Sequence, residues 1–98
     1  MRPVLHGDVS CAARAMMRVP LAQRARFSAE LIARAHAADL HVRRTARLHP
    51  RWGNGSLMAA ARKHPMVPEP GFDDPAYCAC FSQLMQALIR FHANQRRS

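Results

Sequence analysis

The side chains best suited to chemistry in this sequence are six histidines and three cysteines, which are potential metal ligands and nucleophiles. His36 and His41 are five residues apart, so a helix would point them in different directions. His36 and Asp39 are three apart and share a helical face, but two ligands do not make a site. Cys78 and Cys80 are two apart, which places them on nearly opposite sides of a helix. No HExxH or CxxC spacing occurs, so the sequence predicts no metal site and no cofactor.

The sequence also lacks the common catalytic motifs. No Ser-His-Asp order or nucleophile elbow occurs, and the turn Gly53-Asn54-Gly55 lacks the Lys-Ser/Thr pair of a phosphate-binding loop. There are only six Asp and Glu residues, and Asp8 and Asp74 are predicted to be helix N-caps. We therefore predict a non-enzymatic protein with no catalytic residue.

The most suggestive polar group lies near the end of a long predicted helix and in the connector after it. Its members are His36, Asp39, Arg43, Arg44, His49 and Trp52. Asp39 and Arg43 have the i, i+4 spacing, and the order, of a favoured helical ion pair. Asp39 also falls on the apolar side of the helix, and a buried carboxylate needs polar partners from the rest of the group. We interpret the group as a structural polar cluster that holds the connector against the helix. The alternative is that the same residues form a recognition surface.

Arginines support a second interpretation of the same region, as a nucleic-acid-binding surface. The residues that could neutralise phosphates are Arg34, Arg43, Arg44, Arg47 and Arg51, and Trp52 could stack on a base. The pattern does not match a helix-turn-helix, because the connector is long and the following helix is short. Since no nucleic-acid motif is complete, we predict an unidentified protein partner first and keep nucleic acid as the alternative.

Four helices, two long and two short, are predicted to position these residues in a small, irregular, all-α bundle. They are expected at about residues 8–19, 20–47, 56–63 and 74–93. A connector containing Trp and Gly spans 48–55, and a Pro-rich loop spans 64–73. Asp8, Ser56 and Asp74 are the predicted N-caps, and Pro20 and Pro75 the predicted first residues of the long helices. The whole sequence, residues 1–98, is read as one helical domain.

Apolar residues at helical spacing define the predicted core. The last helix carries the clearest stripe, which consists of Tyr77, Phe81, Leu84, Leu88 and Phe91. A large aromatic side chain in a Gly-rich connector usually anchors the connector to a core, so Trp52 is expected to pack there. The polar residues 96–98 are expected to fray.

Composition and charge narrow the class of protein. With 49% hydrophobic and 21% charged residues, the sequence is not that of a disordered chain. Residues 1–63 carry 12 Lys and Arg against three acids, which accounts for the whole net charge of +9. Three cysteines cannot close a disulfide framework, and neither a signal peptide nor a membrane span is evident. These features favour a cytoplasmic protein with no membrane partner. Only six aromatic residues make a thin core, which leaves a homo-oligomer open.

Several blocks of sequence resemble a family of short alphaproteobacterial proteins known only as a domain of unknown function. The blocks are the opening from Pro3 to Val9, the segment Ala35-His36-Ala37-Ala38-Asp39, the connector from His49 to Ala61, and the segment from Phe72 to Tyr77. The resemblance covers nearly the whole chain, and the connector is its most specific part. It implies a bacterial cytoplasmic protein but supplies no activity, ligand or catalytic residue.

Overall fold

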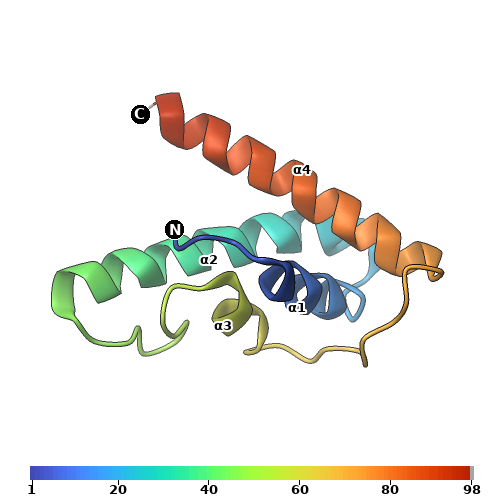
Figure 1. Ribbon diagram of the computed structural model, residues 1–98, viewed down its shortest axis with the longest axis horizontal. Coiled ribbons are helices and arrows are strands. Elements are labelled where there is room, and N and C mark those ends of the chain that lie inside the picture. Colours follow the sequence, from blue (N-terminus) through green and yellow to red (C-terminus); the bar gives the residue numbers. More distant parts are fainter. Residues whose placement is uncertain (98) are drawn as a thin grey trace.

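Within the described residues, four α-helices form where apolar residues recur every three to four positions, and one short 3-10 helix precedes the second of them (Figure 1). The computed structural model describes residues 1–97, with side chains through Arg96. The elements are α1 (His6–Met16), η1 (Leu21–Gln23), α2 (Arg24–Thr45), α3 (Leu57–Ala61) and α4 (Pro75–Arg97). No strand occurs among these residues, and the fold is the small all-α bundle that the sequence predicts.

The start of α1 differs from the prediction, because Asp8 lies inside the helix and not at its N-cap. The helix begins at His6 with Leu5 as N-cap. The Asp8 carboxylate accepts a hydrogen bond from the backbone N–H of Leu5 at 2.9 Å. Its other oxygen accepts one from the backbone N–H of Met58 at 2.9 Å. One buried carboxylate therefore satisfies the N-terminal donors of both α1 and α3 and joins the two helices.

The prediction of one helix over residues 20–47 is also wrong, because the structure has two separate elements there. Pro20 has an extended ψ of 142°, so the chain makes the short η1 helix before α2 begins at Arg24. The guanidinium of Arg24 donates to the carbonyls of Val19 at 3.0 Å and Met17 at 3.3 Å. This side chain satisfies carbonyls that the end of α1 leaves without helical partners. The other end of α2 is closed by Ala46 in the left-handed conformation, with φ of 57°.

The short third helix and the start of the fourth form where the sequence places their caps. Ser56 accepts the backbone N–H of Ala59 at 3.0 Å, and α3 ends at Ala61, before the predicted Lys63. Asp74 accepts the N–H of Ala76 at 2.9 Å, and Pro75 is the first residue of α4. At its other end α4 continues to Arg97, beyond the predicted end at residue 93. Fraying of the tail stays a prediction. Ser98 lies outside the described residues.

The core is filled from all four α-helices. α2 and α4 pack against each other and against α1, while α3 covers α1 and α2 (Figure 1). Many of the core positions are alanines, which let the helices approach closely, and the largest fully buried side chains are Tyr77, Met16, Leu31 and Ile32. In the predicted stripe of α4, Tyr77, Leu84 and Leu88 are buried, whereas Phe81 and Phe91 are only partly buried. The C-terminal part of α4 rises away from the other helices (Figure 1).

Candidate functional site

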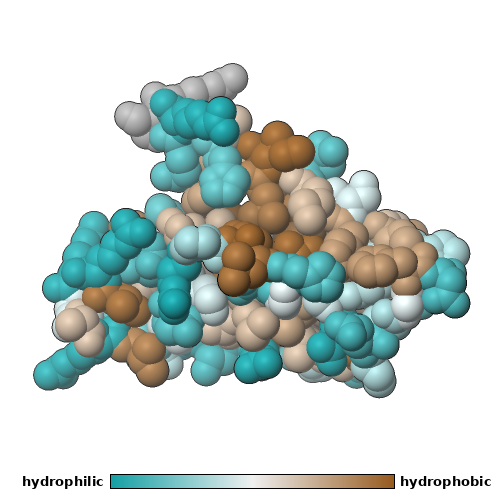
Figure 2. Space-filling view, viewed as in Figure 1, coloured by the Kyte–Doolittle hydropathy of each residue, from teal (hydrophilic) through white to brown (hydrophobic). Residues whose placement is uncertain are grey.

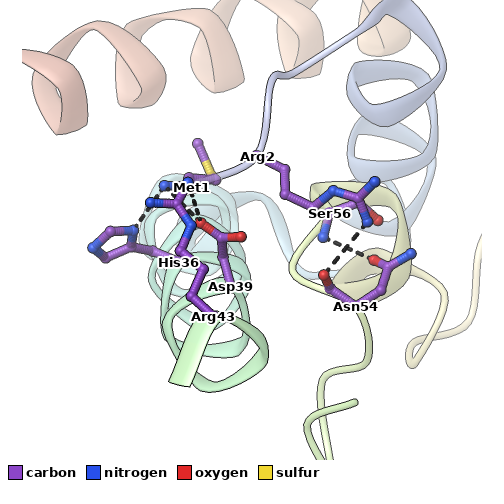
Figure 3. Close-up of polar contacts among 7 residues, drawn as sticks. All are labelled: Met1, Arg2, His36, Asp39, Arg43, Asn54 and Ser56. Carbon is purple, nitrogen blue, oxygen red and sulfur yellow. Dashed lines mark hydrogen bonds and ion pairs between the residues drawn. The ribbon is translucent and has the colours of Figure 1, made fainter. Parts of the chain in front are cut away.

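The predicted polar group is built around Asp39, whose side chain is 6% exposed (Figure 3). Its Oδ2 atom lies 3.1 Å from Nη2 of Arg43, the residue one turn further along α2. The same oxygen lies 3.4 Å from the amine of Met1, a partner that sequence reasoning missed. Neither contact has hydrogen-bond geometry, so Oδ2 is held by two ion pairs alone among the described residues. The pattern around Asp39 indicated burial, but no periodicity could indicate which distant segment would reach it.

His36 completes this cluster. The Met1 amine donates to Nδ1 of neutral His36 at 3.0 Å, and the imidazole packs edge-on against the ring of Phe91 with centroids 5.2 Å apart. Burial lowers the pKa of His36 from 6.5, and the positive Met1 amine lowers it further, while Asp39 opposes the shift. A neutral His36 suits this position, because it can accept from the ammonium group. The cluster therefore joins the N-terminal segment to α2 and, through Phe91, to α4.

The connector does reach α2 at Asp39, but through the backbone of Gly55. A Cβ on Gly55 would lie 2.6 Å from Cα of Asp39, and the φ of Gly55 is +96°. Both the close approach and the left-handed backbone require glycine at this position. The connector thus contacts α2 at Asp39 through the backbone of Gly55, and the imidazole of His49 contacts the ring of His41 further along the helix.

Trp52 and His49 form a separate aromatic group. The indole stacks on the imidazole of His49 with centroids 4.5 Å apart and planes 7° from parallel. The Nδ1 atom of His49 accepts the backbone N–H groups of Arg51 and Trp52, at 3.0 and 3.2 Å. The expectation that Trp52 packs onto the core is wrong, because the ring is only partly buried and does not belong to the core cluster. His49 provides its platform because the His49–Gly53 bridge closes a tight loop on itself.

The five arginines of the nucleic-acid interpretation do not form one stripe. Arg34 and Arg43 lie on opposite faces of α2, because nine residues correspond to two and a half helical turns. Arg34 faces Glu30 at 3.6 Å and Nε2 of His64 at 3.2 Å, beside the end of α3. The other four arginines lie at the C-terminal end of α2 and in the connector, where Arg44, Arg47 and Arg51 are exposed.

An apolar groove lies where the C-terminal half of α4 passes the N-terminal segment and α1 (Figure 2). It has a volume of about 420 Å³ and is lined by Val4, Val9, Met85, Leu88, Ile89, His92, Ala93 and Arg96. Ile89 is 61% exposed and Met85 is 43% exposed, which is unusual for large apolar side chains on a helix that also supplies the core. Met85 and Ile89 have helical spacing beside the main apolar stripe of α4, so the sequence contains a pattern for this second face. Sequence reasoning missed that pattern.

Other reactive groups are dispersed. Burial is the main cause that lowers the pKa of His64, with Arg34 adding to the effect, and burial raises the pKa of the Cys80 thiol. Within the described part of the chain, no three His, Cys, Asp or Glu side chains come together as a set that could hold a metal ion. None of the helices there is long and apolar enough to cross a membrane.

Comparison with known proteins places this arrangement in a family. A family model described as Domain of unknown function (DUF7742) matches residues 2–88. The chain belongs to this family. No curated protein and no solved structure gave a match. The resemblance noted in the sequence is therefore confirmed as a domain of unknown function, while the bacterial origin that it implied stays a prediction.

The DUF7742 match covers the polar cluster around Asp39 and the apolar groove to different extents. It includes the whole of α1, α2 and α3, and the connector with its aromatic stack. Of the cluster around Asp39, it includes the residues of α2, whereas Met1 and Phe91 lie outside it. In α4 it ends at Leu88, so Val4, Val9, Met85 and Leu88 of the groove lie inside the match and Ile89 lies just beyond it. The family description assigns no activity, so function has to be argued from the surfaces themselves.

Proposed function

We propose that this DUF7742 protein is a non-enzymatic interaction module whose apolar groove receives an amphipathic helix of a partner protein. The observation that carries the proposal is the exposure of Ile89 and Met85 beside the buried stripe of the same helix. α4 thus has two apolar faces, and only one of them is covered by the described residues. An uncovered apolar face bordered by polar side chains is typical of protein interaction sites.

The shape of the groove suits a helix. Its walls are α4 on one side and the N-terminal segment with α1 on the other, so it runs beside a long, straight element (Figure 1). An amphipathic helix places apolar side chains at i, i+3, i+4 and i+7 into such a groove and keeps its polar face in water. An extended strand would need unpaired backbone groups along the groove, and α4 offers none because its backbone is helical.

Charge favours an acidic partner over a second copy of the chain. The polar residues that line the groove are His92 and Arg96. α4 contains no Asp or Glu along its 23 residues. Two copies with a net charge of +9 each would repel one another across this face. A helix with Asp or Glu beside its apolar stripe would be attracted to the rim and steered toward the groove.

A cytoplasmic location and the lack of enzymatic activity are parts of the same proposal. The three free cysteines support a reducing compartment. The buried acids support a non-catalytic role, since Asp8 caps two helices and Asp39 is held by two cations. Both are engaged in holding the fold together.

The test is site-specific photo-crosslinking in cells that make the protein. A photoreactive amino acid replaces Ile89 in one variant and Leu21 in the control, because Leu21 is 72% exposed and lies outside the groove. We expect an adduct from position 89 only, and mass spectrometry of the adduct should identify a helical segment with acidic residues beside an apolar stripe. Ile89→Asp should lower the yield of a crosslink from Met85.

Three results would contradict the proposal. Equal adducts from both positions would show non-specific contact. An adduct of the protein with itself, together with a dimer in sedimentation at low micromolar concentration, would make the groove a homo-oligomer interface. An adduct with a partner segment that lacks acidic residues would remove the charge argument.

A further inference from the structure

The end of the molecule formed by the C-terminus of α2 and the connector carries an unbalanced positive charge. Residues 40–63 contain six Lys and Arg and no Asp or Glu. The six are Arg43, Arg44, Arg47, Arg51, Arg62 and Lys63. The nearest acid on α2 is Asp39, which is already paired with Arg43 and the Met1 amine. None of the ion pairs among the described residues involves Arg44, Arg47 or Arg51.

The connector brings these charges together by turning back onto α2. The His49–Gly53 bridge closes the loop that contains Arg51 and Trp52. The ring of His49 then lies 5.1 Å from the ring of His41 on the last turns of α2. Arg51 lies in this loop, so the contact between His49 and His41 places it at the same end of the molecule as the arginines at the end of α2. Trp52 stacks on His49 in the same loop.

A shallow hollow continues this basic end on the far side of the connector. It has a volume of about 290 Å³ and is lined by Gly53, Asn54, Ser56, Met58, Ala59, Arg62 and Lys63. The connector lies directly on α3 there, since a Cβ on Gly53 would be 3.1 Å from Cβ of Ala59. Cations therefore stand on both sides of the connector that holds Trp52.

We infer that this basic end binds single-stranded nucleic acid, with its exposed arginines on successive phosphates and Trp52 stacked on an unpaired base. Several cations without acidic neighbours attract a phosphate backbone, and an aromatic ring among them adds sequence-tolerant stacking. A duplex fits less well, because the stacking surface sits on a short loop and no helix here projects its side to enter a groove. None of these cations lines the groove of α4, so this inference is independent of the proposed protein partner.

Trp52 itself provides the measurement, since it is the only tryptophan. The full chain is titrated with a twelve-nucleotide single-stranded DNA, the matching duplex and a polyglutamate of equal charge, at about 50 mM salt. We expect quenching of tryptophan fluorescence by the single strand, with micromolar affinity. Weaker binding by the duplex and no quenching by polyglutamate complete the expected result.

A matched pair of variants tests the residues. Arg47→Gln with Arg51→Gln removes two charges from the basic end, and Arg18→Gln with Arg90→Gln removes two exposed charges elsewhere. Each phosphate contact contributes about −0.7 to the slope of log affinity against log salt for a single strand. The first variant should therefore lose about 1.4 from that slope and bind about ten-fold more weakly, while the control keeps both. Variants at Trp52 have no tryptophan left to report binding, so their affinity is measured by fluorescence anisotropy of a labelled single strand. Trp52→Ala should bind about ten-fold more weakly, and Trp52→Phe should recover most of the loss.

The inference is overturned by any of three outcomes. No binding of the single strand at about 50 mM salt leaves the arginines as a solvated surface. Equal weakening in the two arginine variants means that only net charge matters. Binding of polyglutamate as tight as that of the single strand, without preference for either, makes the basic end a site for acidic protein segments.

Discussion

Two junctions of the fold each contain one buried carboxylate, and they stabilise it in different ways. Asp8 joins α1 to α3 and accepts two backbone N–H groups, both at 2.9 Å. Asp39 joins α2 to the N-terminal segment and contacts two cations without hydrogen-bond geometry. Asp8 therefore stabilises through directed, short-range bonds, and Asp39 through charge, which salt screens. Counted over the whole residue, Asp8 is 6% exposed and Asp39 is 4% exposed. Burial alone therefore does not tell which kind of junction a carboxylate forms.

The largest effect is expected from Gly55→Ala at the Asp39 junction. The added Cβ would meet backbone atoms of Asp39 within 3 Å and would also occupy a left-handed conformation. Since backbone cannot give way as a flexible side chain can, the free energy of unfolding should fall by about 3 kcal/mol or more. Gly71→Ala is the control, because its nearest neighbour is the side chain of Asp73 in an exposed loop. Chemical denaturation followed by circular dichroism measures both variants. Equal losses would show that the connector does not depend on this contact.

Removing each of the two carboxylates should lower the free energy of unfolding by a different amount and with a different dependence on salt. Asp8→Ala leaves the N–H groups of Leu5 and Met58 without their acceptor and should cost about 2–3 kcal/mol at any ionic strength. Asp39→Ala should cost about 1–2 kcal/mol in low salt and less in 1 M salt, because Arg43 is 65% exposed and can return to water. The measurement is urea denaturation at two salt concentrations. A loss from Asp8→Ala that shrinks with salt as much as that from Asp39→Ala would remove the distinction. No loss of stability in Asp39→Ala would favour its alternative role in recognition.

Protonation should separate the two junctions further. His36 has its pKa lowered below 6.5 in the folded chain, so the unfolded chain binds the extra proton first. The stabilising effect of neutral His36 is complete above pH 6.5 and is lost as the pH falls toward its lowered pKa. Thermal unfolding between pH 7.5 and 5 should therefore show a falling midpoint. His36→Gln should flatten this dependence in part, and the remainder should belong to His64, whose pKa is lowered as well. A midpoint that rises as the pH falls would contradict the assignment.

The smallest effect concerns two neighbouring arginines at the end of α2. Arg43 is paired with Asp39, whereas Arg44 is exposed and takes part in none of the ion pairs among the described residues. Arg43→Gln should cost about 1 kcal/mol and Arg44→Gln less than about 0.5 kcal/mol. Both remove one charge near the helix C-terminus, so the difference isolates the pairing with Asp39. A double-mutant cycle with Asp39→Asn checks it. A coupling energy of zero would mean that the ion pair adds nothing measurable.

The helices could be predicted because their signals are local. Apolar periodicity indicated the core faces, and Ser56 and Asp74 act as N-caps as expected. Asp8 was assigned to the wrong capping position because its second partner, Met58, is 50 residues away and appears in no local pattern. The break at η1 was missed for a related reason, since it depends on Arg24 reaching back to the end of α1.

The candidate sites were harder to predict because they combine distant segments. Asp39 and Arg43 share a helix and could be paired from spacing, but the Met1 amine comes from another part of the chain. Trp52 was expected at the core because aromatic rings usually seek burial, yet His49 in its own loop provides the stacking surface. The groove combines α4 with Val4 and Val9, and periodicity within one helix does not tell which apolar face a neighbour leaves uncovered.

The position of α4 at the end of the described chain has a consequence for synthesis. Tyr77, Cys80, Leu84, Ala87 and Leu88 complete a core whose other members lie in residues 9–61. The ribosome releases α1, α2 and α3 before α4 exists, and the Pro-rich loop adds a further interval. During that time the apolar sides of α1 and α2 that α4 later covers remain exposed to other nascent chains and to chaperones. This helical domain can therefore complete its core only after α4 has been synthesised.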